Sequence, residues 1–265
     1  MNGPRISIIT VVKNGMPYLI DCLKSFQLQN YSNKEHIIIY SNSDDGTKEF
    51  LLSKKNKIQI LREDKKINNK WDCLNLGAEL ATGDIVGILH ADDIFYNENI
   101  LSYIAKNFKN KYKFVYGNVL FCEKENIFKI KRKWISEKLD INKLKYGWMA
   151  PHPSFFFRKK ILLDNKYIND YDISGDYHFM LSVLQKKYKN RFLNHFVCIM
   201  RLGGGSTKIR NILKKINQDI KIAKYFFKNY YICIFFKIFR KIFQIKLLGK
   251  EIKSNKYLIN FNKII

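Results

Sequence analysis

The sequence has few of the residues that mark fibrous, low-complexity or disulfide-stapled proteins. It contains only four prolines and thirteen glycines in 265 residues, which excludes collagen-like and low-complexity classes. The five cysteines are scattered, with no CxxC pair and no metal-ligand spacing, so we expect reduced, buried thiols. Because 46% of the residues are hydrophobic and 15% are aromatic, the chain can build a core, which excludes global disorder.

Two kinds of long hydrophobic segment are also missing. The residues from Met1 to Arg5 lead directly into a predicted strand, with no signal-peptide hydrophobic region before it. No run reaches the roughly 18 uncharged apolar residues that a membrane-spanning helix needs. We therefore expect a cytoplasmic protein that can touch a membrane but does not cross one.

Acidic residues are scarce, and the resulting positive charge is uneven. The whole chain carries a net charge of +25. Residues 208–265 contain fifteen Lys and Arg but only Asp219 and Glu251, a net charge of +13. A basic tail of this kind indicates an acidic partner, such as anionic lipid, nucleic acid or an acidic protein surface.

Strands and helices alternate through the first hundred residues. Continuous β-branched or apolar runs predict buried strands, and polar caps with helical periodicity predict the helices between them. This alternation predicts an α/β fold with a mostly parallel sheet and helices on both faces. The predicted strands are 5–12, 35–40, 58–61 and 84–89, and the predicted helices begin at Pro17, after Thr47 and at Trp71.

The pattern loosens after about Ser102. Strands are predicted at 114–122, 127–134, 155–158 and 192–200, with a helix over 176–184. From Ile209 to about Leu248 the sequence indicates mostly helix. We therefore divide the chain into a catalytic domain, residues 1–206, and a basic, aromatic, helical extension, residues 207–265.

The most informative motif is the run IVGILHADD, residues 85–93. A short apolar strand ends abruptly in Asp92 and Asp93. Open α/β sheets bind ligands at the carboxyl ends of their strands, and hard cations such as Mg²⁺ take carboxylate oxygens. The motif by itself is also compatible with a strand followed by an Asp-rich helix cap.

Four segments occur in a characteristic order: the opening strand, the loop SNSDDGT at 41–47, the helix WDCLNLGAEL followed by ATGD, and the turn HADD. In this order the chain resembles the family-two inverting glycosyltransferases with the GT-A fold. The resemblance covers about residues 5–206. It implies a Rossmann-like mixed sheet flanked by helices, and an enzyme that moves a sugar from a nucleotide donor.

The resemblance also implies roles for single residues. Asp92 would be the ligand of Mn²⁺ or Mg²⁺, Asp93 would orient the turn, and Asp176 in the segment ISGDY would be the catalytic base. A carboxylate takes the proton from the attacking acceptor hydroxyl, while the metal neutralises the departing diphosphate. The implied donor-binding residues are Val11, Ser41, Asp72, His90, Ala91 and His152. Arg201 and the loop Gly203–Ser206 resemble a segment that closes over the donor.

Two positions depart from the family pattern. Tyr40 and Ser41 stand where the family usually has an acid that pairs with uracil, and His90 replaces the first acid of the metal motif. A UDP-sugar remains the donor that the resemblance favours, with a glycan or polyprenyl-diphosphate-linked acceptor in cell-surface polysaccharide synthesis. A glycosyltransferase-like protein that has lost activity is the alternative left open by the departures.

The segment from Tyr225 to Leu248, YFFKNYYICIFFKIFRKIFQIKLL, allows three interpretations. Lys237, Arg240, Lys241 and Gln244 form one polar stripe on a helix otherwise rich in Phe, Tyr and Ile. Such a helix can lie on the inner membrane surface with its basic face toward anionic headgroups, which is the interpretation we favour. It can instead pack its apolar face on the domain. A nucleic-acid-binding surface is the third interpretation, although no RNP, zinc-finger or helix-turn-helix pattern occurs.

Overall fold

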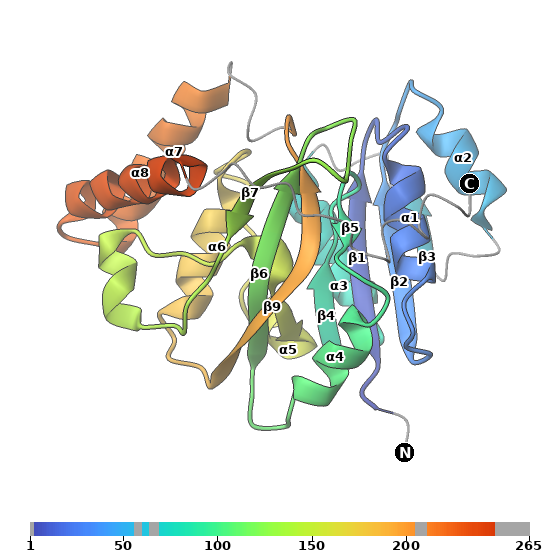
Figure 1. Cartoon of the computed structure of the whole chain (residues 1–265), viewed down its shortest axis with the longest axis horizontal. Helices are drawn as coiled ribbons and strands as arrows, with labels where there is room; N and C mark the ends of the chain where they lie inside the picture. The colour runs from blue at the N-terminus through green and yellow to red at the C-terminus, as the bar shows by residue number, and fades with distance from the viewer. Residues whose placement is uncertain (1–2, 56–59, 64–68, 205–210, 247–265) are drawn as a thin grey trace.

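A computed structural model describes residues 3–55, 60–63, 69–204 and 211–246, without the side chains of Ile60 and residues 241–246 (Figure 1). One nine-stranded sheet, in the order β3-β2-β1-β4-β8-β6-β9-β5 with β7 paired to β6, runs through the described part. The strands are β1 (Ile6–Val12), β2 (Lys34–Tyr40), β3 (Ile60–Glu63), β4 (Ile85–Ile88), β5 (Ile94–Phe95), β6 (Phe114–Cys122), β7 (Ile130–Trp134), β8 (Phe156–Arg158) and β9 (Asn190–Arg201).

The helices connect these strands and extend beyond the last one. They are α1 (Leu19–Gln27), α2 (Thr47–Ser53), α3 (Lys70–Leu80), α4 (Ile100–Asn107), α5 (Lys159–Asp164), α6 (Gly175–Leu184), α7 (Ile212–Phe226) and α8 (Tyr230–Lys246). Two short 3-10 helices, η2 (Ile141–Tyr146) and η3 (His152–Ser154), precede β8.

The predicted α/β fold is confirmed, with a sheet that is mixed toward one side. β1, β2, β3 and β4 are parallel, as the alternation of elements predicts. β8 then pairs antiparallel with both β4 and β6, and β9 pairs parallel with β6. Most strands therefore end at the same edge of the sheet. Because β8 runs in the opposite direction, it begins at this edge, and η3, which directly precedes β8, lies there too.

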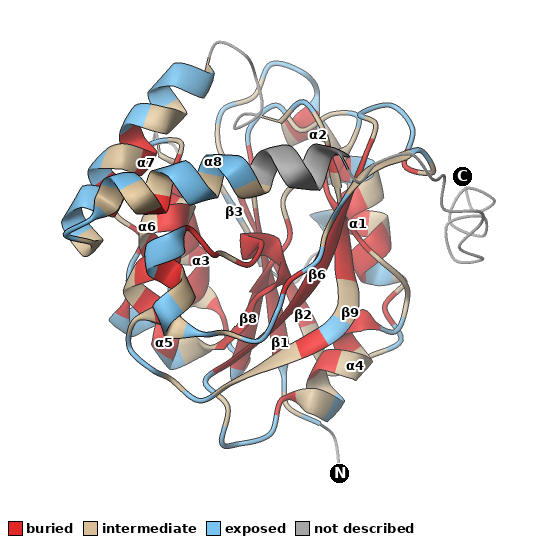
Figure 2. Cartoon of the chain, turned by 60° about the vertical axis from the view of Figure 1, so that its left-hand side comes forward, coloured by how far each residue is buried: buried red, intermediate tan, exposed pale blue. Residues whose placement is uncertain are grey.

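Helices cover both faces of the sheet, and alternate residues of each strand point to opposite faces (Figure 2). Ile6 and Ile8 of β1 pack with residues of α1 and α4, whereas Ile9 packs with residues of α3, α5 and α6. The strands β1, β2, β4 and β6 are almost entirely buried in the centre of the molecule, whereas β7 at the side is not. The five cysteines are free and buried, which confirms the prediction of reduced core thiols.

The C-terminal helices pack on the face that carries α6. Ile222 of α7 belongs to the main core cluster, and Cys233 of α8 is fully buried. One prediction is wrong here: Lys237 is not on an outward basic face, because its ammonium pairs with Asp219 at 2.9 Å. Several large aromatic side chains of α8 are exposed instead, among them Tyr231, Phe235 and Phe239. Lys241 and Gln244 lie outside the described side chains.

Within the described residues, no helix combines the length and the apolar composition that crossing a bilayer requires.

Candidate active site

The turn after β4 carries the acidic motif to the carboxyl edge of the sheet. The Leu89 N–H donates to the carbonyl of Ile9 at 3.1 Å, and the Thr10 hydroxyl donates to the Leu89 carbonyl at 2.8 Å. The N–H of Asp93 then donates to the His90 carbonyl at 3.0 Å and closes the turn. These bonds hold the motif against the end of β1.

The two aspartates of this turn have different surroundings. Asp92 is half-buried, whereas Asp93 is 1% exposed. One carboxylate oxygen of Asp93 accepts the Arg201 N–H at 3.3 Å, and the other has no hydrogen-bond partner among the described residues. Burial, reinforced by the neighbouring Asp92 charge, raises the pKa of Asp93 well above its ordinary value. Asp92 is therefore the member of the pair that can present a carboxylate to a ligand.

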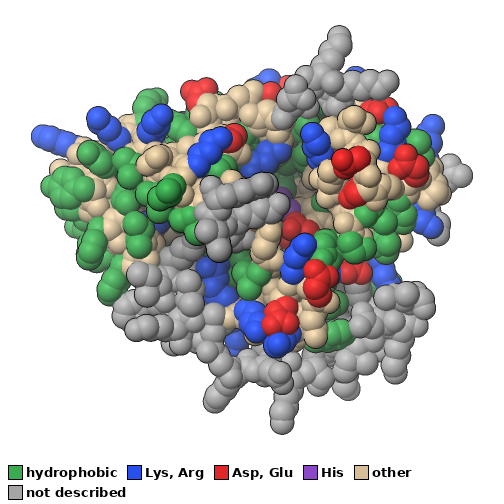
Figure 3. All heavy atoms as spheres, turned by 90° about the horizontal axis from the view of Figure 1, so that it is seen from above, with side chains coloured by type: hydrophobic (Ala, Val, Ile, Leu, Met, Phe, Trp, Pro, Cys, Tyr) green, Lys and Arg blue, Asp and Glu red, His purple; other side chains and the backbone are tan. Residues whose placement is uncertain are grey.

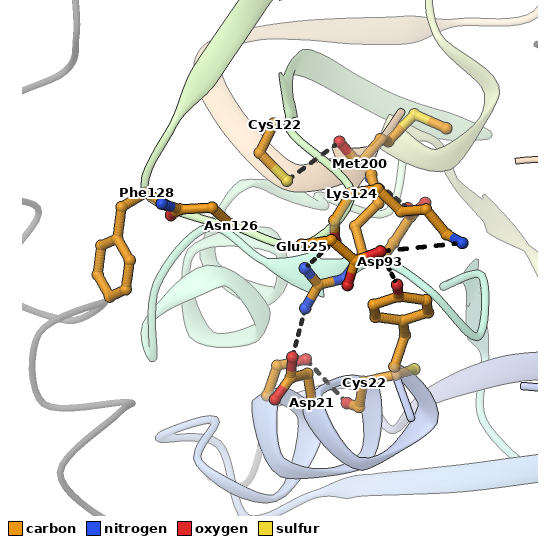
Figure 4. Close-up of polar contacts among 12 residues, drawn as sticks. Asp21, Cys22, Asp93, Cys122, Lys124, Glu125, Asn126, Phe128 and Met200 are labelled. Carbon is orange, nitrogen blue, oxygen red and sulfur yellow. Dashed lines mark hydrogen bonds and ion pairs between the residues drawn. The ribbon is translucent and has the colours of Figure 1, made fainter. Parts of the chain in front are cut away.

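An arginine at the end of β9 ties this turn to α1 (Figure 4). The Arg201 guanidinium pairs with Asp21 of α1 and donates to the Lys124 carbonyl at 2.9 Å. It also lies 4.8 Å from the ring centroid of Tyr18. The glycine loop that follows begins beside the metal motif, since a Cβ placed on Gly204 would lie 3.3 Å from Asp92 Oδ2.

Asp176 lies in the first turn of α6, where the helix dipole favours a negative charge. Its Oδ1 accepts the N–H of Tyr177 at 2.8 Å. Gly175 allows this turn to sit on α3, because a Cβ there would lie 2.5 Å from the Trp71 indole. Burial opposes the charge, but neighbouring cationic groups lower the pKa of Asp176 below its ordinary value, so the group is a carboxylate at neutral pH. The groups that are cationic at neutral pH are Lys215, Lys70 and Lys237, and the His152 ring acts in the same direction when it is protonated.

Two histidines lie between Asp92 and Asp176. The rings of His90 and His152 are stacked, with centroids 6.2 Å apart. His152 Nε2 lies 2.7 Å from the Tyr167 hydroxyl, and its Nδ1 is buried with no partner among the described residues. Burial lowers the pKa of His152 to about 4 and also lowers that of His90. Both rings are therefore neutral at pH 7.

The predicted nucleotide side of the site is formed by loops after β1 and β2. Val11 is half-buried near the end of β1, and the Ser41 N–H donates to the Val12 carbonyl at 3.2 Å. The 41–47 loop is fastened to the loop after β1, because Asp45 accepts the Met16 N–H at 2.8 Å. Ala91 lies against the same loop: a Cβ on Gly15 would be 3.7 Å from it.

Asp72 is placed in the first turn of α3, facing the segment between α5 and α6. Its carboxylate accepts a hydrogen bond from Asn169 at 2.5 Å. Two residues earlier, the Lys70 ammonium lies 4.2 Å from the ring centroid of Trp71 and acts on Asp176. Lys70 therefore borders the site from α3, whereas Asp72 contacts the segment that precedes α6.

Sequence reasoning missed the cations around Asp176. Lys70, Lys215 and Lys237 come from α3, α7 and α8, and each acts electrostatically on the same carboxyl group. Lysine is so frequent in this chain that these three carry no local signal. Tyr167 was also missed, because its position between Asn75 and His152 depends on contacts between segments that are distant in the sequence.

The donor set of the site fits a metal that is held jointly with a substrate. Among the described residues, no group of three or more His, Cys, Asp and Glu is arranged to hold an ion alone. Mg²⁺ is commonly bound through one or two carboxylates, with phosphates and waters completing its shell. Asp92 supplies such a carboxylate at the rim, so the residues present fit a metal–diphosphate complex.

The sequence of residues 7–172, more than half of the chain, matches the model of the family "Glycosyl transferase family 2". The chain belongs to this family. The family that the motifs resemble is thus confirmed.

Related proteins agree with the family 2 assignment. An uncharacterized glycosyltransferase of Rickettsia prowazekii, RP339, is 32% identical over 190 residues, which are 64% of this chain and 58% of the relative. A Campylobacter jejuni GalNAc(5)-diNAcBac-PP-undecaprenol beta-1,3-glucosyltransferase is 28% identical over 173 residues, 63% of this chain and 55% of the relative. The chain thus spans little more than half the length of these relatives.

Solved structures confirm the GT-A fold of this family 2 glycosyltransferase. Staphylococcus aureus TarS 1-349 in complex with UDP-GlcNAc has a TM-score of 0.61 at 16% identity, covering 83% of this chain and 65% of TarS 1-349. The mannosyltransferase PcManGT from Pyrobaculum calidifontis, in complex with GDP-Man and Mn²⁺, has a TM-score of 0.56 at 18% identity, covering 90% and 65%. At sequence identities this low, the similarity to these structures shows a shared fold alone.

Proposed function

We propose that this glycosyltransferase moves one sugar, with inversion, from a nucleotide-sugar to a glycan or lipid-linked acceptor. The observation that carries the proposal is the pairing of two different carboxyl groups in one site. Asp176 is held ionised by surrounding cations, and Asp92 stands at the rim, with the stacked rings of His90 and His152 nearby. Separate carboxylates for base and metal are what inverting transfer requires.

In this mechanism Asp176 acts as the general base. Its carboxylate accepts the proton of the acceptor hydroxyl as that oxygen attacks the anomeric carbon. Ionisation at neutral pH is the state that this role needs, and the three neighbouring lysines, Lys215, Lys70 and Lys237, favour it. No covalent intermediate forms, so no separate nucleophile is needed.

Asp92 would hold Mn²⁺ or Mg²⁺ together with the donor diphosphate. A bound divalent ion supplies Lewis-acid stabilisation of the departing diphosphate. The neutral ring of His90, two residues before Asp92, can hydrogen-bond the donor without adding charge. Asp93 keeps the turn in place through its contact with Arg201.

The donor that we favour is a UDP-sugar, with a hexose as the transferred group. TarS 1-349 binds UDP-GlcNAc, and the loop carrying Ser41 lies beside Val11 at the end of β1, where a base would sit. We assign Asp72 to the hydroxyl groups of the donor, and His152 to the diphosphate or acceptor side. The lipid-linked substrate named for the Campylobacter glucosyltransferase supports a polyprenyl-diphosphate-linked acceptor in surface polysaccharide synthesis.

We further infer that α7 and α8 rest on the inner membrane surface by an apolar face. Figure 3 shows hydrophobic and basic side chains gathered at the left end of the molecule, where both helices lie in Figure 1. Exposed lysines 221, 224 and 228 flank this face, which suits anionic lipid. Its exposed members are Ile212, Leu213, Tyr225, Tyr231, Phe235, Phe236, Ile238 and Phe239.

A thermal-shift titration with UDP, GDP and dTDP, each with and without Mn²⁺, tests the donor side. A ligand that binds only the native state raises the melting temperature by mass action. We expect a shift with UDP that requires Mn²⁺ and disappears in Asp92→Asn. Asp84→Asn is the matched control, since Asp84 is exposed at the opposite end of the same strand. Absence of any shift, or an equal shift in Asp92→Asn, would contradict the proposed metal site.

A further inference from the structure

Lys237 of α8 is directed into the domain. Its side chain is 23% exposed, and its ammonium pairs with the Asp219 carboxylate of α7 at 2.9 Å. The same ammonium lies 3.1 Å from the ring centroid of Tyr177. A lysine that meets a carboxylate and an aromatic face together has both an ionic and a cation–π partner.

The α8 backbone is fixed at the same place. Gly147 has a φ of +69°, and a Cβ there would lie 2.5 Å from the backbone nitrogen of Lys237 and 2.6 Å from the carbonyl oxygen of Cys233. Only glycine allows this approach without displacing the helix. Cys233, one turn before Lys237, has its sulfur 3.5 Å from the Tyr177 hydroxyl. Residues from two successive turns of α8 therefore contact Tyr177.

Tyr177 connects this contact to the chemistry, because it follows Asp176. The N–H of Tyr177 donates to Asp176 Oδ1 at 2.8 Å, so the position of the tyrosine backbone sets the position of the carboxylate. On the other side, Lys215 of α7 lies 3.8 Å from Asp219 and 3.4 Å from the Ser174 hydroxyl. The first turn of α6 is thus enclosed by both C-terminal helices.

We propose that Lys237 is a positioning residue for glycosyl transfer, which anchors Tyr177 and thereby holds the Asp176 carboxylate toward the acceptor. The inference rests on the proposed role of Asp176 as the base. This role makes α8 a part of the active site. One side of α8 is exposed and apolar, and its opposite side supports the proposed base, Asp176.

The charges that face Asp176 set the expected pH dependence. Lys237 is one of several groups that lower the pKa of Asp176 against the opposing effect of burial. Its removal takes away positive charge, so the carboxylate takes up a proton at higher pH. The other titratable groups facing Asp176 are Lys70 of α3, His90 after β4, His152 of η3, Tyr167 before α6 and Lys215 of α7.

The test compares Lys237→Met, Lys237→Arg and the exposed control Lys109→Met by kcat and donor KM across pH. We expect Lys237→Met to lower kcat about tenfold with donor KM within about twofold, as for a group that acts on the chemical step. The acid limb of its kcat profile should move to higher pH, and Lys237→Arg should restore most of the activity. Unchanged kcat and acid limb in Lys237→Met would overturn the proposal.

A double-mutant cycle separates this inference from the function on which it rests. The urea midpoints of Lys237→Met, Asp176→Asn and the double variant do not depend on catalysis. We expect the midpoint loss caused by Lys237→Met to be smaller when Asp176 is already Asn, because the attraction between the two charges is then absent. Strictly additive losses would overturn the link between Lys237 and Asp176, whether or not the protein transfers a sugar.

Discussion

Asp93 and Asp176 are both aspartates at the carboxyl edge of one sheet, yet their surroundings shift their pKa values in opposite directions. Asp93 is enclosed beside the charge of Asp92, and burial raises its pKa. Burial also opposes the ionised form of Asp176, but the positive charges of Lys215, Lys70 and Lys237 lower its pKa. Neighbouring charge therefore decides which carboxyl group can serve as a base, and these neighbours come from segments far apart in the sequence.

The buried ion pair between Arg201 and Asp21 gives a prediction about stability. The Arg201 side chain is 4% exposed and that of Asp21 is 26% exposed. We expect Arg201→Met to lower the free energy of unfolding by about 3 kcal/mol, since it leaves a half-buried carboxylate without its partner. Urea denaturation measures the change.

The exposed pair of Lys166 and Glu79 is the matched control for Arg201. Their side chains are 58% and 49% exposed at a separation of 2.8 Å. Lys166→Met should change the free energy of unfolding by less than about 1 kcal/mol. Equal losses in the two variants would show that burial of the Arg201 pair has no energetic consequence.

The buried His36 predicts how stability depends on pH. Burial, with the charge of Lys34, lowers its pKa to about 3, against about 6.5 in an unfolded chain. Between these values the unfolded state binds more protons, so the free energy of unfolding falls as pH falls, by up to about 1.4 kcal/mol per pH unit for this group. His36→Phe should flatten the fall between pH 6 and 4 in urea titrations. An unchanged slope would contradict the assignment.

At the scale of elements, local sequence patterns predict where most strands lie. They do not predict which strands pair with one another. The run EHIIIY predicts β2, whose buried Glu35 accepts hydrogen bonds from Ser7 and Thr82. The insertion of β8 between β4 and β6 could not be predicted, because three residues carry no signal of which edges they join. The strand predicted at 127–134 begins later, at Ile130, since the preceding residues form a turn.

The orientation of α8 is the clearest difference between periodicity and packing. The spacing of its polar residues correctly predicts an amphipathic helix. It does not predict that Lys237 points inward, because the partner that draws it, Asp219, lies on another helix. Charge pairing thus places the basic side against the domain and the aromatic side outward.

This orientation predicts which residues bind lipid. We expect the double variant Phe235→Ser, Phe239→Ser to reduce co-sedimentation with anionic vesicles about tenfold, because burial of these side chains in lipid is lost. The two residues are 63% and 46% exposed, so folding should be preserved. The control pair Ile135→Ser, Leu163→Ser changes exposed apolar residues elsewhere. Equal binding by both double variants would contradict a specific role of α8.

At the scale of the whole molecule, the sheet gathers at one edge what the sequence spreads over more than 200 residues. The motifs predict the HADD turn and the Asp176 segment, and the fold brings both into one electrostatic neighbourhood through His90. The cations that complete this neighbourhood come from α3, α7 and α8. Their part could not be predicted, because it depends on the packing of the C-terminal helices.

The most direct test of the account is sugar transfer by Asp176→Asn, measured as UDP release from a UDP-hexose in the presence of Mn²⁺ and a lipid-linked acceptor. The account predicts that kcat falls about 10³-fold while the affinity for UDP stays within about twofold, as expected when a general base is lost. Asp84→Asn should behave like the unaltered protein. Transfer by Asp176→Asn at the unaltered rate would contradict the central claim.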